Sequence, residues 1–432
     1  MTRVTILPSP LNGAFTLPPS KSHLQRVLIL SAITGGTARL GTDGILCDDI
    51  EATMRCLSSL GAVFERQGRV IRAAKTLTVD DLPHGAVLPC GESGATARFL
   101  LPLAAMFADN AVLTGEGSLN TRPMDDICVS LAAHGAVLSD KHLPIRITTR
   151  ADRKGVFRVA GNISSQFLSG LLITLPLTEN ASVVCDTALK SADYVKMTCG
   201  VMRRFGADVT ENGGCYTASH GYSSPTSPIL IDSDFSGGAF FFGAVSDGCT
   251  VTAHGHTSCD LPRGDRRMLD ILRAMGDTVT ETTDSVSVSG NGTRHGVRID
   301  VSDCPDLVPI LAVIAAAARG KTVLQGTDRL RFKESDRVNS VCGMISSLGG
   351  HIYTEADSLI IHGDGSLRGG KVDCRGDHRI AMAGAAAAVF CRENVVLDNA
   401  DCVNKSYPSF FDDLCRLNGR VIKEPQTERN RT

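Results

Sequence analysis

The 432-residue chain has almost no excess charge of either sign and no paired cysteine motif. Lys and Arg number 44 against 46 Asp and Glu, which argues against a nucleic-acid binder whose affinity comes from an overall positive field. The 15 cysteines are scattered singly, without CxxC pairs or Cys/His ligand spacing. We therefore expect no disulfide framework and no metal site, and we predict that the cysteines are small buried hydrophobes in a reducing compartment.

The sequence also lacks long hydrophobic runs. Residues 1–10 do not contain the apolar stretch of a signal peptide, so we expect a cytoplasmic protein. The most apolar runs, Leu307–Ala318 and Ile380–Phe390, are shorter than the roughly 20 residues that span a membrane, and they predict buried helices. With 43% hydrophobic and 21% charged residues, the composition is that of a soluble globular protein.

A helix end followed by a glycine turn and a β-like run recurs six times along the chain. The intervals between successive glycines are 74, 71, 70, 73 and 70 residues. We expect each glycine to cap its helix in the left-handed conformation. The glycines are Gly61, Gly135, Gly206, Gly276, Gly349 and Gly419.

A second marker, a helix start about 40 residues before each glycine, repeats with the same period. Ser, Asp and Pro at these starts either satisfy unpaired amides or need no amide. Each unit of about 70 residues holds two helical patterns and short β-like runs, and it is longer than the 20–50 residues usual in a solenoid. The sequence therefore predicts two compact α/β domains of three units each. The starts are Ser20–Ser22, Glu92–Gly94, Ser164–Gln166, Asp234–Ser236, Cys304–Asp306 and Gly376–His378.

Several predicted helix starts carry polar groups suited to an anion. Lys21, Ser22 and Arg26 lie in the first turns of one helix, where free amides and the helix dipole favour a negative ligand; the alternative is a solvated basic cap. The glycine-flanked turn Gly91–Arg98 is not a Walker loop. Ser164, Ser165 and Gln166 offer uncharged hydrogen-bonding groups for hydroxyls or phosphate; the alternative is an ordinary capping motif.

Cations recur near the second helix of each unit and at the last repeat. They are Arg122, the segment Arg331–Arg337, Arg379 and Lys405. A charge run is usually a solvated face, but these recur at one position of a repeat. His378 is predicted to be a neutral hydrogen-bonding residue because no metal-ligand partner lies at the required spacing.

Together these motifs resemble the EPSP synthases (3-phosphoshikimate carboxyvinyltransferases). The resemblance covers residues 8–420 and the sixfold repeat. Lys333–Arg337 (KESDR) and Asp377–Arg379 (DHR) are its most specific parts, with Lys21, Ser22, Arg26, Ser164–Gln166 and Pro305–Asp306 in the same order. The chain departs from the family pattern at Glu92, Ala95 and Arg329, where Asn, Thr and Asn are frequent.

The resemblance implies an α/β, two-domain enolpyruvyl-transferase fold of six βαβαββ repeats, three per domain. Residues 20–231 would form an inserted domain, residues 1–19 and 232–432 would form the other, and the active site would lie in the cleft between them. The implied reaction moves the enolpyruvyl group of phosphoenolpyruvate to the 5-hydroxyl of shikimate 3-phosphate and releases phosphate by addition and elimination through a tetrahedral intermediate. The resemblance implies no cofactor, metal, nucleic-acid or membrane partner, and a monomer.

The resemblance also implies roles for individual residues. Asp306 would accept the proton of the attacking hydroxyl, and Glu334 with Lys21 would handle protonation of the vinyl carbon. The acceptor, shikimate 3-phosphate, would contact Lys21, Ser22, Arg26, Ser164, Ser165, Gln166, Ser191, Asp306 and Lys333. Phosphoenolpyruvate would contact Lys21, Gly94, Arg122, Gln166, Arg337, Arg379 and Lys405.

Two alternatives compete with this hypothesis. The related transferase that acts on UDP-N-acetylglucosamine shares the fold and the donor, but typically carries a reactive cysteine shortly before an Arg-Pro; Gly115–Pro123 contains no cysteine. A non-catalytic binding protein made of α/β repeats would need no acid and base, whereas Asp306, Glu334 and Lys21 are all present.

Overall fold

The computed structural model describes residues 2–42, 44–256, 261–262 and 264–424, which form two compact units. Unit 1 contains residues 2–18, 233–256 and 264–424, and unit 2 contains the described part of 19–232 with Leu261 and Pro262. Within unit 2 the Ser20 amide donates to the Asp232 carbonyl over 2.7 Å, and within unit 1 the Asp234 amide donates to the Pro18 carbonyl over 2.8 Å. The two chain segments that lead from one unit to the other, near residues 18–20 and 232–234, are thus joined by backbone hydrogen bonds.

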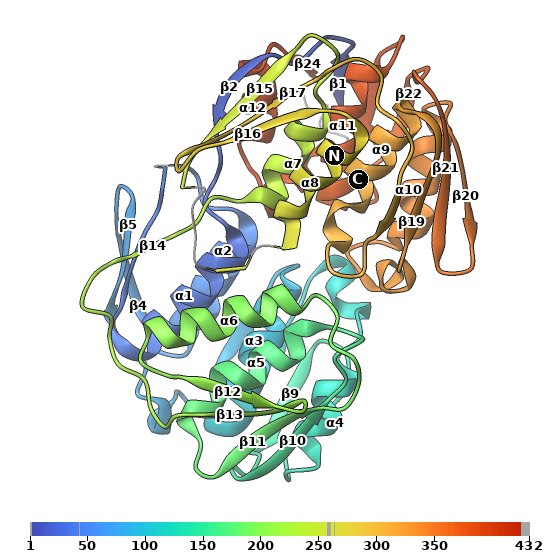
Figure 1. The fold of residues 1–432 in the computed structure, drawn as a ribbon. Helices are drawn as coiled ribbons and strands as arrows, with labels where there is room; N and C mark the ends of the chain where they lie inside the picture. The colour runs from blue at the N-terminus through green and yellow to red at the C-terminus, as the bar shows by residue number, and fades with distance from the viewer. Residues whose placement is uncertain (1, 43, 257–260, 263, 425–432) are drawn as a thin grey trace, which may run out of the picture. The chain divides into compact units, whose positions relative to one another are not determined.

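Unit 2 consists of three copies of a βαβαββ pattern (Figure 1). The first copy contains β14 (Ile229–Leu230), α1 (Lys21–Thr34), β3 (Thr37–Arg39), α2 (Asp48–Ser59), β4 (Val63–Gln67) and β5 (Val70–Lys75). The second contains β6 (Val87–Pro89), α3 (Gly94–Phe107), β7 (Val112–Thr114), α4 (Asp125–Ala132), β8 (Val137–Leu138) and β9 (Ile145–Thr149). The third contains β10 (Gly155–Val159), α5 (Ser165–Thr174), β11 (Ala181–Cys185), α6 (Ala192–Arg204), β12 (Val209–Asn212) and β13 (Cys215–Ala218).

Unit 1 contains the other three copies. The first is β2 (Gly13–Thr16), α7 (Phe235–Gly243), β15 (Thr250–His254), α8 (Arg267–Met275), β16 (Thr278–Glu281) and β17 (Ser285–Ser289). The second is β18 (Arg298–Asp300), α9 (Val308–Ala317), β19 (Arg319–Gln325), α10 (Arg337–Ser347), β20 (His351–Glu355) and β21 (Ser358–Asp364). The third is β22 (Gly370–Asp373), α11 (His378–Ala387), β23 (Val395–Asp398), α12 (Phe410–Arg416), β24 (Arg420–Lys423) and β1 (Val4–Leu7).

Short 3-10 turns connect these elements. They are η1 (Val79–Asp81), η2 (Gly117–Thr121), η3 (Leu175–Leu177), η4 (Gly264–Arg266), η5 (Pro305–Leu307), η6 (Asp328–Phe332), η7 (Ala388–Phe390) and η8 (Ala400–Lys405).

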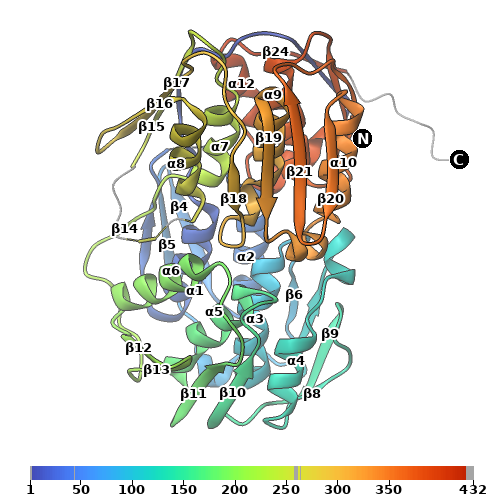
Figure 2. The same cartoon turned by 45° about the vertical axis from the view of Figure 1, so that its right-hand side comes forward.

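Every copy forms one four-stranded sheet with the same strand order. The first strand is parallel to the second, as β6 is to β7 across α3. The fourth strand lies antiparallel between the second and third, as β9 lies between β7 and β8. Figure 2 shows this arrangement in the β18-β19-β21-β20 sheet of unit 1. The predicted α/β fold of six βαβαββ repeats is confirmed.

Two strands belong to the sheet of one unit, although the helix that follows each of them belongs to the other unit. Strand β14 leads into α7 of unit 1 but pairs with β3 of unit 2, whereas β2 leads into α1 of unit 2 but pairs with β15 of unit 1. Strand β1 completes the sheet of β22, β23 and β24. Three sheets are therefore closed by strands distant in the sequence.

The six predicted helix starts are confirmed, and side chains cap five of them. Ser20, Ser93, Ser164, Asp234 and Asp377 each accept a hydrogen bond from a backbone N–H two or three residues further on. The start at Cys304 lacks such a cap, and the chain enters α9 through η5, with Pro305 at its first position. Proline has no amide to satisfy there.

Five of the six predicted glycine caps have a positive φ, but the sixth prediction is wrong. Gly61, Gly135, Gly206, Gly276 and Gly349 have φ of 104, 89, 82, 117 and 83°. In the last copy Asn418 takes the left-handed conformation, with φ 68°, which asparagine tolerates better than most residues. Gly419 is needed for a close approach, because a Cβ there would lie 2.6 Å from the Leu414 carbonyl oxygen.

The first helix of each copy is largely buried. In unit 2 these helices are α1, α3 and α5, and α5 packs against both α3 and the partly exposed α6 (Figure 1). The two predicted buried helices are confirmed, since α9 is buried from Val308 to Ala316 and α11 from His378 to Ala387. Among the described residues, no helix combines the length and the apolar character needed to cross a membrane.

The prediction for the cysteines is only partly correct. All 14 cysteines in the described part of the chain are free thiols, but seven are buried, six are intermediate and Cys415 is exposed.

Candidate active site

Lys21 is held by a carboxylate that the sequence analysis did not single out. Its Nζ lies 2.6 Å from Oδ2 of Asp49, in the first turn of α2, and the two side chains are 16% and 6% exposed. A cation at a helix N-terminus opposes the helix dipole, so a neighbouring carboxylate offsets that cost. Lys21 is therefore fixed between two helices instead of forming a solvated cap.

Arg26 lies beneath the start of α1 and reaches α6. Its Nε donates to Thr198 Oγ1 over 2.7 Å, Nη2 to the Tyr194 carbonyl over 3.1 Å, and Nη1 to the Ser22 carbonyl over 2.7 Å. Burial lowers the pKa of Arg26 to about 10, opposed by Tyr194 and Cys199. Because all three nitrogens bond to the protein, Arg26 fixes the turn of Ser22 relative to α6, whose N-cap is Ser191.

Gly94 and Arg122 are in direct contact. A Cβ added at Gly94, the first residue of α3, would lie 2.9 Å from Nη1 and 3.0 Å from Cζ of Arg122. Both residues are buried. Glycine is thus the residue that allows the Arg122 guanidinium to lie over the N-terminus of α3.

Arg98 connects the remaining polar groups of unit 2. Its Nη1 donates to Gln166 Oε1 over 2.7 Å, and its Nη2 donates to the carbonyl of Pro123 over 3.2 Å, next to Arg122. Ser164 caps α5 and Ser165 is buried at its first position. The α5 start and the Arg122 turn are therefore joined through one guanidinium.

A buried hydroxyl network joins α1, α2 and α3. Gln25 Nε2 lies 3.1 Å from Thr53 Oγ1, 3.2 Å from Ser93 Oγ and 3.2 Å from Thr96 Oγ1. Thr53 in turn donates to the carbonyl of Asp49 over 2.8 Å. The network connects the helix starts that carry Lys21, Asp49 and Gly94.

Unit 1 brings five predicted site residues into one cluster around Asp306. Asp306 Oδ1 lies 3.2 Å from Lys333 Nζ and 2.6 Å from Arg337 Nη1. Its Oδ2 lies 3.0 Å from Arg379 Nη2. Glu334 joins the cluster through Arg337, at 2.6 Å.

Arg337 is completely buried at the centre of this cluster. Besides Asp306 and Glu334 it contacts Asp377, with Nε 2.8 Å from Oδ2. Asp377 also caps α11 through the Arg379 amide and accepts from the Ser335 hydroxyl. Burial would lower the pKa of Arg337, but its three carboxylate neighbours raise it above the ordinary value.

The same contacts determine the protonation of Asp306 and Lys333. Burial favours the neutral form of Asp306, but Arg379, Lys333 and Arg337 hold its pKa well below the usual range. Burial lowers the pKa of Lys333, although Asp306 opposes the shift. Asp306 is therefore an ionised carboxylate surrounded by three cations.

Three further residues lie in unit 1. Arg329 donates to the Ser302 carbonyl over 2.8 Å, and burial lowers its pKa. Lys405 is buried at the end of η8, which packs against α11. His378 is buried at the start of α11. Within the described residues, no group of three or more His, Cys, Asp or Glu side chains is placed to hold a metal ion.

Comparison with known proteins identifies the family. A family model described as EPSP synthase (3-phosphoshikimate 1-carboxyvinyltransferase) matches residues 7–414. The chain belongs to the EPSP synthase family. Proteins named 3-phosphoshikimate 1-carboxyvinyltransferase are 36% identical in Clostridium novyi and 38% in Clostridium kluyveri, each over 98% of both chains. An EPSP synthase structure from Acinetobacter baumannii is 26% identical, with a TM-score of 0.80 over 98% of this chain and 100% of that one.

Sequence reasoning about this EPSP synthase family member missed several residues that organise the site. Asp49, Arg98 and Gln25 were not selected, because each is an ordinary helical residue whose partner is distant in the sequence. Asp377 was noticed only as part of a motif, although its position at a predicted helix start was a usable signal for an N-cap.

Proposed function

We propose that this member of the EPSP synthase family transfers the enolpyruvyl group of phosphoenolpyruvate to the 5-hydroxyl of shikimate 3-phosphate and releases phosphate. The observation that carries the proposal, beyond family membership, is the Asp306 carboxylate ionised among Lys333, Arg337 and Arg379. Such a cluster offers both a base and several cations to highly anionic substrates.

In this proposal the polar groups at the helix starts bind the two substrates. The acceptor contacts Lys21, Ser22, Arg26, Ser164, Ser165, Gln166, Ser191, Asp306 and Lys333. Phosphoenolpyruvate contacts Lys21, Gly94, Arg122, Gln166, Arg337, Arg379 and Lys405. Helix N-termini and Arg side chains favour phosphate and carboxylate oxygens.

Asp306 is the proposed base for the acceptor hydroxyl. In the ligand-free cluster its depressed pKa makes it a weak base. Substrate phosphate and carboxylate groups that engage Lys333 and Arg379 weaken their interaction with Asp306 and add negative charge. Both effects raise the pKa of Asp306 toward the range useful for proton transfer.

The chemical steps then follow from charge and proton balance. The acceptor oxygen attacks C2 of phosphoenolpyruvate as its proton passes to Asp306, and the vinyl carbon gains a proton from Glu334 or Lys21, which gives a tetrahedral ketal. The group that donated this proton, Glu334 or Lys21, then takes one back from the new methyl group, and departure of phosphate restores the vinyl group on the acceptor. No metal or cofactor takes part in this proposal.

Replacing Arg379 with Lys is expected to weaken phosphoenolpyruvate binding at least about tenfold. A charge-assisted hydrogen bond is worth roughly 1.5–3 kcal/mol, and Lys cannot reproduce the planar fork of Arg. Calorimetric titration in the presence of acceptor measures the effect. Arg375→Lys, in the turn before α11 and paired with the exposed Asp373, is the matched control, and equal affinities for the two variants would rule out the role of Arg379.

Gly94→Ala is expected to raise KM for phosphoenolpyruvate about tenfold and to leave kcat within about threefold, since it displaces a binding group that acts before the chemical step. The new Cβ would occupy the space of the Arg122 guanidinium. Steady-state kinetics with varied donor give the result. Gly343→Ala, where no atom lies within 4 Å of the added Cβ, controls for a glycine substitution in a helix, and an unchanged donor KM in Gly94→Ala would contradict the assignment.

The proposal requires ligand contacts from both units, with the active site between them. Adding both substrates should slow amide hydrogen exchange at the starts of α1 and α5 in unit 2 and at η6 and α11 in unit 1. Protection confined to one unit would contradict the two-unit site. We further propose a monomer acting in the cytoplasm, because the assigned residues of both units come from one chain.

Phosphate release with each candidate acceptor tests the function directly. We expect release from phosphoenolpyruvate only when shikimate 3-phosphate is present. Release that depends on UDP-N-acetylglucosamine would assign the related transferase instead, and release with neither acceptor would exclude both.

A further inference from the structure

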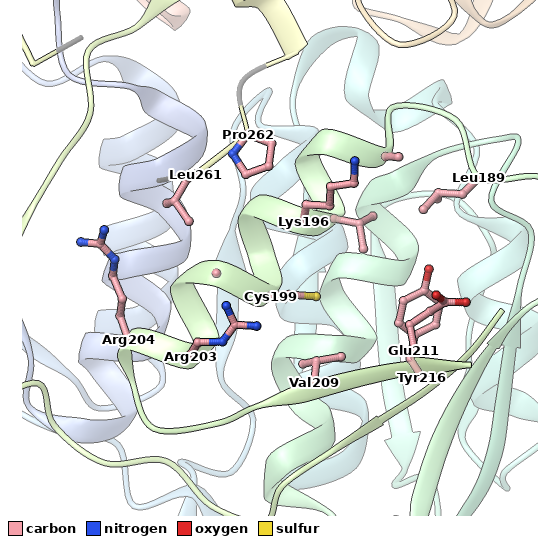
Figure 3. Close-up of a pocket in the computed structure, with 13 residues that line it drawn as sticks. Leu189, Lys196, Cys199, Arg203, Arg204, Val209, Glu211, Tyr216, Leu261 and Pro262 are labelled. Carbon is pink, nitrogen blue, oxygen red and sulfur yellow. The ribbon is translucent and has the colours of Figure 1, made fainter. Parts of the chain in front are cut away.

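Unit 2 contains a pocket formed by residues other than those assigned to the substrates. Its volume is about 530 Å³, within the range typical of small-molecule sites. The outer face of α6 lines it, with the β12–β13 hairpin on one side and Leu261 and Pro262 at the other end (Figure 3).

The interior of this pocket combines apolar surface with neutral hydrogen-bond donors. Val195 and Val209 line it together with the ring of Tyr216, and the Cys199 sulfur points toward Tyr216 (Figure 3). Burial raises the pKa of Cys199 to about 11 and that of Tyr216 to about 12. In the part of the chain that the structure describes, the Tyr216 hydroxyl makes no hydrogen bond, so this protonated donor can serve a ligand in the pocket.

Two cations at the mouth of the pocket form exposed ion pairs. Lys196 Nζ lies 3.4 Å from Asp193 Oδ1, and Arg203 Nε lies 2.9 Å from Asp208 Oδ1; the two cationic side chains are 64% and 67% exposed. Exposed ion pairs of this kind contribute little stability, so a ligand anion can replace the carboxylate partner.

The remaining charged groups of the lining leave the pocket with more positive than negative side chains. Arg204 adds a third cation. Glu211 is the carboxylate of the lining, and its Oε1 accepts the Gly214 amide of the hairpin turn over 2.8 Å. The lining therefore holds three cations against one carboxylate, and that carboxylate accepts a hydrogen bond from the hairpin.

We propose that this pocket binds a small amphipathic anion, with an aromatic or alicyclic body and one carboxylate or sulfonate group. The body lies against Val195, Val209 and Tyr216, and the anionic group reaches Lys196 and Arg203. A ligand rich in hydrogen-bond acceptors suits a lining rich in donors. The proposal is independent of enolpyruvyl transfer.

The probe 8-anilinonaphthalene-1-sulfonate has this chemistry, and its fluorescence intensity increases when it moves from water into an apolar site. We expect saturable binding at one site of the full chain. Cys199→Phe fills the space beside Tyr216 and should weaken binding at least about tenfold. Arg203→Glu, at an exposed position, should weaken it about fivefold.

Two control variants separate this pocket from the substrate site and from general charge effects. Arg153→Gln removes an exposed cation of unit 2 that pairs with Asp80, and it should leave probe affinity unchanged. Arg379→Lys should also leave it unchanged. Wild-type affinity in Arg203→Glu, or in Cys199→Phe with an unchanged Tm, overturns the proposal, as does loss of binding in Arg379→Lys. If Cys199→Phe does not fold, the comparison of probe affinity between Arg203→Glu and Arg153→Gln decides whether the proposal holds.

Discussion

Asp306→Asn is expected to lower kcat by about 100- to 10,000-fold, the range typical of general acid–base catalysis. The substitution keeps the shape of the side chain but removes the group that accepts the hydroxyl proton. Acceptor binding should stay near normal, because the surrounding cations Lys333, Arg337 and Arg379 remain. Single-turnover rates and acceptor titration together separate chemistry from binding.

Glu334→Gln should likewise lower kcat and leave acceptor binding near normal if Glu334 supplies a proton to the vinyl carbon. Asp303→Asn is the matched control, since it removes the same charge from an exposed position three residues before Asp306, and it should keep kcat within about twofold. If either active-site variant turns over at a near-native rate, that residue is not an essential proton carrier, and Lys21 becomes the leading candidate.

Arg337→Gln should lower the free energy of unfolding by about 3–5 kcal/mol, because it leaves three carboxylates without their shared buried cation. The guanidinium is 1% exposed and contacts Asp306, Glu334 and Asp377. This structural role precedes any contact with phosphoenolpyruvate. Denaturant unfolding followed by circular dichroism measures the loss.

Arg331→Gln provides the comparison for a surface pair in the same segment. Its partner is Asp336, and the two side chains are 49% and 33% exposed, so the expected loss is at most about 1 kcal/mol. Equal losses in the two variants would contradict the assignment of Arg337 as the cation that holds the cluster together.

The repeat architecture could be predicted from the sequence because each copy carries local signals. Capping residues such as Ser93 and Asp377 begin helices, and glycines such as Gly61 end them. The assignment of β2 and β14 to different domains came from the family resemblance and not from a local signal, because the copies look alike whether a strand pairs beside its own helix or in another copy. The last cap was misassigned for a related reason: Asn418 and Gly419 are adjacent, and only the backbone shows which one is left-handed.

The sequence identified the charged residues of the candidate site, but it did not show which side chains fix their positions. Lys21 and Arg379 stand out because a cation at a helix start is unusual. Their supports, Asp49 and Asp306, lie 28 and 73 residues away in the sequence. Such pairs depend on the packing of whole helices, which no local pattern encodes. Arg337, which was predicted only to bind phosphoenolpyruvate, has three carboxylate partners within its own unit.

The central claim, transfer of an enolpyruvyl group, is tested most directly with phosphoenolpyruvate labelled with oxygen-18 in the bridge between carbon and phosphorus. Addition and elimination break the bond between C2 and the bridging oxygen, so mass spectrometry should find the label in the released phosphate when shikimate 3-phosphate is present. Unlabelled phosphate, with the label retained on the three-carbon product, would show cleavage at phosphorus and would contradict the account.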